Sequence, residues 1–173
     1  ELPKSTVNAL TAMQPPASPG IRTVESNQIH LTLHFLGLSD PIRIGDLLNG
    51  IQLPAFQIRI NGVGRFDGRD GGVILWAGVE QNSALISLHN SIADRLNEAG
   101  CKTEARPYRP HITLARCRAR SDVRVIERFL GENAKMEMEH VPILSFALFS
   151  STQIGQAHRY RVEQQYLLQK SIS

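Results

Sequence analysis

Two short stretches of the sequence repeat a pattern of residues that could do acid–base chemistry. His30 and Thr32 stand two residues apart in "HLTLHFLG", and His111 and Thr113 do the same in "HITLAR", 81 residues later (111 − 30 = 81). In a β-strand, residues two apart point to the same face, about 6.6 Å from each other along the strand. Each motif therefore predicts one imidazole and one hydroxyl on a common face, with apolar side chains turned the other way.

Two such faces across a groove would bring together two imidazoles and two hydroxyls. The pKa of imidazole is near 6.5, so at neutral pH one ring can act as a general acid while the other acts as a general base. The hydroxyls can hold phosphoryl oxygens. This set of groups suits in-line displacement at phosphorus, in which one histidine activates water and the other protonates the leaving oxygen.

Other chemistries fit the sequence less well. A single strand histidine is more often structural, but a repeated pair with identical threonine spacing argues against that interpretation. A zinc site built from His30, His34 and His111 is an alternative, yet the sequence has no HExxH or CxxC motif and no acidic residue near either histidine motif. We therefore expect no metal and no other cofactor. The sequence also lacks a G-x-S-x-G elbow and a Walker loop.

Periodicity and capping signals predict the elements that position these motifs. The strand over 29–36 is predicted from its period of two, and the helices over 39–51 and 121–132 from their capping residues Asp40 and Asp122. The helix over 83–100 has an apolar face. The full set of expected helices is 2–14, 39–51, 83–100 and 121–132, and of expected strands 21–24, 29–36, 55–63, 72–80, 111–116, 143–151 and 159–168.

The order of these elements indicates an internal duplication. Each half reads helix, His-x-Thr strand, helix, strand, strand, and corresponding positions lie 78 to 82 residues apart (83 − 5 = 78; 122 − 40 = 82). We expect one domain over 1–173, with halves of about 1–70 and 71–173. A strand, 72–80, precedes the first helix of the second half. Because nothing precedes the corresponding helix of the first half, we expect its N-terminal strand to be absent.

Composition narrows the class of protein. The chain has 173 residues, 42% of them apolar, which is typical of a globular domain. Its net charge of +3 and pI of about 9.1 permit an anionic substrate. No apolar run approaches the roughly 18 residues of a membrane span, so we expect no membrane association. Two cysteines are too few for a disulfide framework and fit a cytoplasmic location.

The paired motifs "HLTLHFLG" and "RPHITLAR", with "VILWAGVE" between them, resemble the two-histidine phosphoesterase superfamily. More closely they resemble the RNA 2′,3′-cyclic phosphodiesterases, historically called 2′-5′ RNA ligases. The resemblance covers essentially the whole chain. It implies a bilobal α+β fold in which two pseudo-symmetric antiparallel sheets flank a central groove, with helices on the outside. Family members begin with a strand of the type "RLFxAI", whose absence agrees with the gap that the duplication indicates.

Position by position, the resemblance implies that His30 and His111 are the catalytic acid and base, and that Thr32 and Thr113 bind the phosphate. It also implies that Phe35 stacks on the terminal base. Arg116 likewise matches a phosphate-contacting arginine of the family. A strict period of two, however, places Phe35 and Arg116 opposite the histidines, so they reach the groove only if the strands twist or bulge.

The implied reaction is metal-independent opening of a terminal 2′,3′-cyclic phosphate of RNA to a 2′-phosphate. The expected partners are RNA ends or oligonucleotides that carry this group, tRNA fragments among them, and the expected state is a monomer. One alternative is ligation or cleavage of 2′-5′ linkages. Another is a binding module for RNA ends without catalysis, which the intact His-x-Thr pair disfavours.

Overall fold

The computed structural model describes residues 1–101, 103, 106–154 and 157–170, with the side chains of 153–154 and 157–159 excepted. Its helices are α1 (Lys4–Ala12), the 3-10 turn η1 (Ser26–Gln28), α2 (Pro41–Leu48), α3 (Ser83–Glu98) and α4 (Val123–Asn133). Its strands are β1 (Ile21–Thr23), β2 (Phe56–Asp67), β3 (Val73–Val79), β4 (His111–Cys117), β5 (Glu137–Ile143), β6 (Ser145–Ile154) and β7 (Ala157–Leu167). None of these helices is both long and apolar enough to cross a bilayer.

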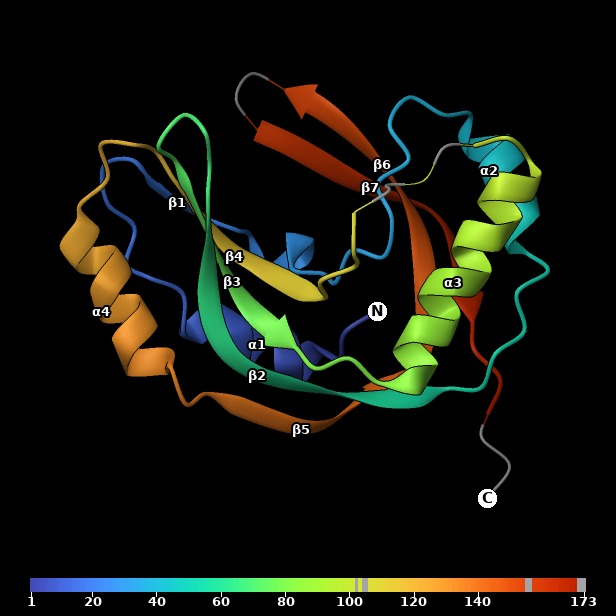
Figure 1. Cartoon of the computed structure of the whole chain (residues 1–173), viewed down its shortest axis with the longest axis horizontal. Coiled ribbons are helices and arrows are strands. Elements are labelled where there is room, and N and C mark those ends of the chain that lie inside the picture. The colour runs from blue at the N-terminus through green and yellow to red at the C-terminus, as the bar shows by residue number, and fades with distance from the viewer. Residues whose placement is uncertain (102, 104–105, 155–156, 171–173) are drawn as a thin grey trace.

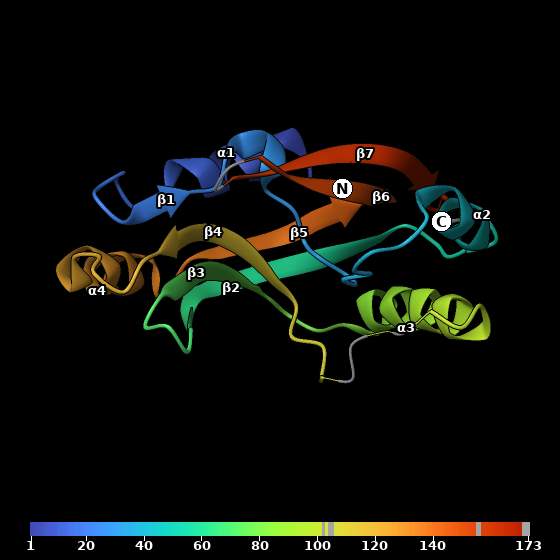
Figure 2. The ribbon, with the colours of Figure 1, turned by 90° about the horizontal axis from the view of Figure 1, so that it is seen from above.

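The strands form two antiparallel sheets. One sheet has the order β1-β4-β3-β2-β5, and the other is the hairpin β6-β7. Figure 1 shows α4 at one end of the molecule and α2 beside α3 at the other, with the sheets between them. Seen from above in Figure 2, the β6-β7 hairpin lies in a different layer from β2, β3 and β4. The predicted α+β class with two antiparallel sheets is confirmed.

The capping residues that the sequence indicates begin two of the helices. The Asp40 carboxylate accepts a hydrogen bond from the backbone N–H of Ile42 at the start of α2, where Pro41 stands in the first turn. At the start of α4, the Asp122 carboxylate accepts one from Arg124. The two caps occur at corresponding places in the two predicted halves.

The core lies on one face of the five-stranded sheet. Alternate residues of β3 and β4 are fully buried there, and the apolar face of α3 joins the same cluster. The buried members from these three elements are Leu75, Ala77, Ile112, Leu114, Leu85, Leu88, Ile92 and Leu96. The other face of β4 is therefore left for polar side chains.

Two strand predictions are wrong. Residues 29–36 form no strand, because their one sheet-type contact is an isolated bridge between Leu31 and Ile112. Conversely, β5 is a strand that the sequence did not predict. It carries the charged residues Glu137 and Glu139, it contains Pro142, and His140 adopts a positive φ of 54°. These features hide the period of two from which a strand is predicted.

A cavity of about 780 Å³ explains why residues 29–36 lack strand partners. The residues that line the cavity include the continuous run 26–39 and the run 145–151 of β6. Because consecutive residues of both runs line the cavity, the backbone edge of each run, rather than one alternating side-chain face, borders the space. At one end of it, the amino group of Glu1 donates a hydrogen bond to the carbonyl of Ser145.

Candidate active site

The second His-x-Thr motif lies on β4, a strand held by backbone pairing. β4 pairs with β3 from end to end, and its last three residues also pair with β1. Ile112 and Leu114 are fully buried and point into the core. His111 and Thr113 therefore share the opposite face, as the sequence predicts.

A β-bulge brings Arg116 to the face that carries His111. The pairing register between β3 and β4 shifts here, and two consecutive residues of β4, Leu114 and Ala115, are both buried. Alternation then resumes one residue late, so the exposed Arg116 lies on the same side as His111. The bulge that the sequence analysis requires of this strand is therefore present.

Gln14, directly after α1, helps to hold this bulge. Its side-chain amide donates hydrogen bonds to the carbonyls of Val24, at 2.8 Å, and Leu114, at 3.1 Å. The Leu114 carbonyl also accepts from the backbone N–H of Val24 at 2.9 Å. The carbonyl at the irregular position is thus satisfied twice, which a regular ladder would not provide. Sequence reasoning missed Gln14, because a lone glutamine after a helix carries no signal of this role.

The two motif histidines are oriented in the same way. His30 Nδ1 lies 2.7 Å from the carbonyl oxygen of Gln28, and His111 Nδ1 lies 2.7 Å from that of Arg109. A carbonyl oxygen can only accept, so each Nδ1 carries the donated proton. Each ring is left with Nε2 for acid–base chemistry, and the backbone two residues upstream fixes the tautomer.

The two motifs lie next to each other. The bridge from Leu31 to Ile112 joins the residues enclosed by the two His-x-Thr pairs and runs antiparallel. Antiparallel pairing sets each histidine opposite the threonine of the other motif. The histidines are then diagonal neighbours, for which Cβ atoms are typically about 7–8 Å apart.

His30 lies in an environment that favours the neutral ring. Burial lowers the pKa of His30 below its ordinary value of 6.5, and the positive charges of Arg116 and His111 lower it further. The hydrogen bond to the Gln28 carbonyl acts in the opposite direction. The effect of Arg116 and His111 on His30 agrees with their placement around one site.

Aromatic rings from the β6-β7 hairpin flank His30. Phe149 of β6 stacks on the imidazole, with ring centroids 5.9 Å apart, and Tyr160 of β7 contacts it edge-on at 5.2 Å. These residues form the His30 side of the site and were not predicted. The duplication could have indicated Phe149, since it lies 83 residues after Phe66 (149 − 66 = 83), which occupies the equivalent place beside the other histidine.

The corresponding rings beside His111 come from β2 and β3. Phe66 contacts the imidazole edge-on at 4.9 Å, and Trp76 lies at 6.4 Å. Gly64 stands opposite Trp76 in the ladder, and a Cβ there would lie 2.2 Å from the indole ring. Gly64 is therefore what allows Trp76 to lie flat over β2.

Phe35 and His34 occupy different surroundings. The side chain of Phe35 is 61% exposed, so it is available to a ligand and does not pack in the core. His34 is turned toward α3, where it stacks on His89 at 4.1 Å and donates from Nε2 to the His89 carbonyl at 2.8 Å. His34 thus joins the 29–36 segment to α3.

Tyr108, which lies just before the second motif, contacts both His89 and the first motif. Its ring stacks on His89 with centroids 4.1 Å apart, and its hydroxyl donates to the carbonyl oxygen of Thr32 at 3.2 Å. Burial raises the pKa of Tyr108, so the hydroxyl remains a donor. The residue that precedes the second motif by three positions therefore holds the backbone of the first.

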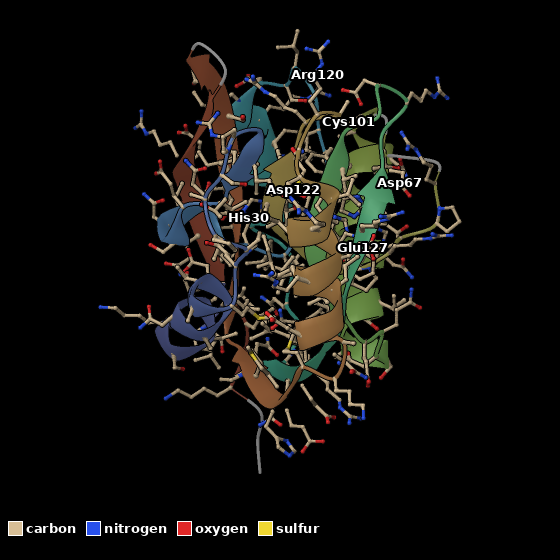
Figure 3. All side chains as sticks on the ribbon, turned by 90° about the vertical axis from the view of Figure 1, so that its left-hand side faces the viewer. His30, Asp67, Cys101, Arg120, Asp122 and Glu127 are labelled. Atoms are coloured by element: carbon tan, nitrogen blue, oxygen red, sulfur yellow. The ribbon has the colours of Figure 1, made fainter. Side chains whose placement is uncertain are left out.

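No group of three or more His, Cys, Asp or Glu side chains converges in the way that a metal ion requires, as far as the described residues go. Acidic side chains near the sheet instead pair with arginines. Arg65 contacts Asp67 at 3.3 Å and Glu127 at 3.0 Å. In the view of Figure 3, these two carboxylates lie on the β2 and α4 side, whereas His30 lies across the molecule from them.

Comparison with known proteins places the chain in a family. Residues 2–147 match the model of the 2′-5′ RNA ligase superfamily. An RNA 2′,3′-cyclic phosphodiesterase of Aeropyrum pernix is 29% identical over 145 residues, which cover 82% of each chain. One of Thermotoga maritima is 27% identical over 148 residues, which cover 83% of this chain and 77% of that one. Escherichia coli LigT complexed with 3′-AMP has a TM-score of 0.69 at 26% identity, over 97% of this chain and 94% of that one. By this match over most of its length, the chain belongs to the 2′-5′ RNA ligase superfamily.

Proposed function

We propose that this protein hydrolyses terminal 2′,3′-cyclic phosphates of RNA to 2′-phosphates without a metal ion. The observation that carries the proposal is the pair of imidazoles, His30 and His111, which share one face and each keep Nε2 for chemistry. Relatives named RNA 2′,3′-cyclic phosphodiesterase align over most of the chain. The intact pair of His-x-Thr motifs favours catalysis over binding alone.

In the proposed mechanism, His111 acts as the base and His30 as the acid. Nε2 of His111 takes a proton from water as the water oxygen bonds to phosphorus. The bond from phosphorus to the ribose 3′ oxygen breaks, and Nε2 of His30 gives its proton to that oxygen. The product is a 2′-phosphate monoester, and exchange with solvent then returns both rings to their starting protonation states.

The remaining site residues bind the substrate in this proposal. The hydroxyls of Thr32 and Thr113 and the guanidinium of Arg116 hold the two non-bridging oxygens, where negative charge accumulates. Phe35 stacks on the terminal base, for which its exposed ring is suited. Phe35 and His30 share one segment, so the nucleoside and the leaving 3′ oxygen should lie on the His30 side.

The substrates in the cell are RNA ends or oligonucleotides with a 2′,3′-cyclic phosphate, tRNA fragments among them. We further propose that residues 1–173 act as a single domain and a monomer, and that the protein works in the cytoplasm. Supporting the single domain, the core cluster runs through both halves, from Leu10 of α1 to Phe129 of α4.

The test is hydrolysis of a nucleoside 2′,3′-cyclic phosphate with and without the chelator EDTA, followed by separation of 2′- and 3′-phosphate products. We expect a 2′-phosphate and no effect of EDTA. A 3′-phosphate would contradict the assigned leaving group, and sensitivity to EDTA would contradict the metal-free mechanism. Absence of turnover would contradict the proposal as a whole.

A substrate analogue with sulfur in place of the 3′ oxygen assigns the two roles, because a thiolate leaves without prior protonation. It should restore turnover to His30→Ala but not to His111→Ala. The opposite pattern would show that the acid and the base are exchanged.

A second function is favoured by the family model, which is named for 2′-5′ RNA ligases. Joining a 2′,3′-cyclic phosphate end to a 5′-hydroxyl end uses the same two histidines in the same roles, with the 5′-hydroxyl in place of water as the nucleophile and the 3′ oxygen again as the leaving group. Incubation of two such oligonucleotides and analysis for a 2′-5′ linkage would detect this activity beside the hydrolysis.

A further inference from the structure

β4 lies between the first motif and the strands β3 and β2. Ile112, at the centre of the second motif, pairs with Leu31 along one edge of β4 and with Ala77 of β3 along the other. β2 follows β3 in the same sheet. A line from the first motif through His111 therefore continues onto β3 and then onto β2, about 4.8 Å further for each strand.

Two aromatic side chains occupy β3 and β2 along this line. Trp76 stands opposite Thr113 in the ladder, so it shares the face of the second motif. Its indole lies over Gly64 of β2, where a Cβ would come within 2.2, 2.3 and 2.9 Å of three ring atoms. Phe66 packs beside the indole with ring centroids 5.2 Å apart, and both residues are partly exposed. One face of the indole thus rests on β2, and the other is turned away from the sheet.

The neighbours of these two rings on β2 and β3 are apolar. Gly64 lies under the indole, and Ile74 stands opposite Phe66 in the ladder. Arg65 alternates with them and points to the other face, where it pairs with Glu127 of α4. Aromatic rings on such a surface suit the flat face of a nucleobase, and this kind of stacking accepts any base.

The direction of the proposed reaction relates this surface to the nucleophile. His111 activates the nucleophile, and the 3′ oxygen leaves on the side of His30, because the attacking and leaving oxygens lie on opposite sides of phosphorus. Water carries no further group, whereas the 5′-hydroxyl of an RNA carries a nucleoside that must extend past His111 and away from His30. Phe66 and Trp76 lie on that side, with ring centroids 4.9 and 6.4 Å from the imidazole of His111.

We propose that Phe66 and Trp76 form an acceptor subsite, which binds the base of the nucleotide whose 5′-hydroxyl attacks the cyclic phosphate. His111 takes the proton of that hydroxyl as its oxygen bonds to phosphorus. The bond from phosphorus to the 3′ oxygen breaks, and His30 gives its proton to the 3′ oxygen. The product is a 2′-5′ phosphodiester with a free 3′-hydroxyl. This proposal rests on the proposed function, since the same two histidines transfer the protons in both reactions.

The test measures how cytidine 2′,3′-cyclic phosphate is divided between two products, the 2′-phosphate and the 2′-5′ dinucleotide formed with adenosine as acceptor. The ratio of dinucleotide to 2′-phosphate should rise with adenosine concentration and saturate. Methyl β-D-ribofuranoside, which has the 5′-hydroxyl but no base, should give a lower ratio without saturation. Phe66→Leu and Trp76→Leu should each lower the adenosine ratio about 5- to 30-fold, as for one lost base stack. Partial unfolding lowers both products together and leaves the ratio unchanged.

Two further variants are matched controls. Phe66→Tyr keeps the ring and should keep the ratio. Phe149→Leu removes the equivalent ring beside His30, so it should change both products together and leave the ratio as in the wild type. The subsite is overturned by equal ratios for the two acceptors, by an unchanged ratio in both Phe66→Leu and Trp76→Leu, or by an equal fall in Phe149→Leu.

A second measurement separates this subsite from the proposed function. Trp76 is the single tryptophan of the chain, so its fluorescence reports directly on a base stacked against it. Adenosine should quench this fluorescence to saturation, methyl β-D-ribofuranoside should not, and Phe66→Leu should raise the half-saturating adenosine concentration about 5- to 30-fold. If the wild-type protein turns over no cyclic phosphate, the proposed function fails and the quenching alone decides the subsite. If hydrolysis proceeds without quenching and without dinucleotide, the subsite fails and the hydrolysis stands.

Discussion

The two His-x-Thr segments are held in place by different kinds of interaction. The segment with His111 is a strand with a neighbour on each side, so backbone hydrogen bonds position it. The segment with His30 has one isolated bridge, and individual side chains supply its other contacts, among them Tyr108 and His34. The two equivalent His-x-Thr motifs are thus positioned by backbone pairing in one case and mainly by side-chain contacts in the other.

This difference predicts which of the two motifs is more sensitive to side-chain substitutions. Backbone pairing survives most side-chain substitutions, whereas a contact made by one hydroxyl is lost with one atom. Substitutions remote from the chemistry should therefore affect the first motif more than the second, while substitutions of the reacting groups should affect both equally.

The largest effect is expected from replacing the two histidines, and it tests whether both motifs contribute equally to activity. His30→Ala and His111→Ala should each lower kcat by about 10²-fold or more, because each removes one proton-transfer group. The measurement is steady-state hydrolysis of a nucleoside 2′,3′-cyclic phosphate. His140→Asn is the control, since His140 is exposed on β5 and its positive φ tolerates asparagine. Near-wild-type rates in either variant would contradict the two-histidine mechanism.

The next effect concerns the hydroxyls. Thr32→Ala and Thr113→Ala should each cost about 1–3 kcal/mol of transition-state stabilisation, as for a lost hydrogen bond to a charged group. The kcat/KM values of the two variants should agree within a few-fold. A much larger loss for one threonine would show that the two sides do not share the phosphate oxygens.

An added strand should give the segment with His30 the backbone pairing that the segment with His111 already has. A copy of residues 73–79 joined in front of Glu1 would place an alternating apolar strand in the cavity beside β6, as β3 lies beside β4. Thermal unfolding should then shift upward by roughly 4–8 °C, which for a domain of this size is about 2 kcal/mol. An extension of seven glycines and serines is the matched control. Equal Tm values for the two extensions would contradict the strand-shaped cavity.

A smaller effect is expected from the Tyr108 hydroxyl. Tyr108→Phe removes its hydrogen bond to the Thr32 carbonyl and should cost about 0.5–1.5 kcal/mol. Since Thr32 belongs to the site, kcat should fall along with stability. Tyr166→Phe is the matched control, because its buried hydroxyl donates to the carbonyl of Gly45 away from both motifs. If both variants lose stability but neither loses kcat, Tyr108 does not position the first motif.

The smallest effect is a shift in the pH profile. His30 must be protonated to act as the acid, so activity is lost as the pH rises through its pKa. Arg116 lowers that pKa, and Arg116→Gln should therefore raise it and move the descending limb of kcat/KM to higher pH. If neither limb moves, the charge of Arg116 does not act on His30.

Much of this architecture follows from local sequence signals. The period of two in β4 and the caps at Asp40 and Asp122 depend on nearby residues, and they predict the elements correctly. The 29–36 segment has the same period of two, yet it is not a strand. A strand needs a neighbour with which to pair, and periodicity within one segment carries no information about that neighbour.

The parts of the site that sequence reasoning missed are long-range contacts. The position of Arg116 relative to the motifs depends on a bulge that is held by Gln14, about a hundred residues away in the chain. The rings of Phe149 and Tyr160 reach His30 from a separate hairpin. Such contacts are set by packing between elements, and only the duplication offered an indirect signal for one of them.

The carbonyls that orient the two imidazoles have a consequence for the direction of the reaction. By microscopic reversibility, the ring that takes a proton when the phosphodiester opens must return it when the bond closes. Gln28 and Arg109 bind each ring through Nδ1 in the same way, so neither Nε2 is built to be permanently the donor or the acceptor. In the proposed mechanism the same site can therefore form a 2′-5′ linkage and cleave it back to the cyclic phosphate, and the relative supply of water and of 5′-hydroxyl RNA decides which nucleophile opens the cyclic phosphate.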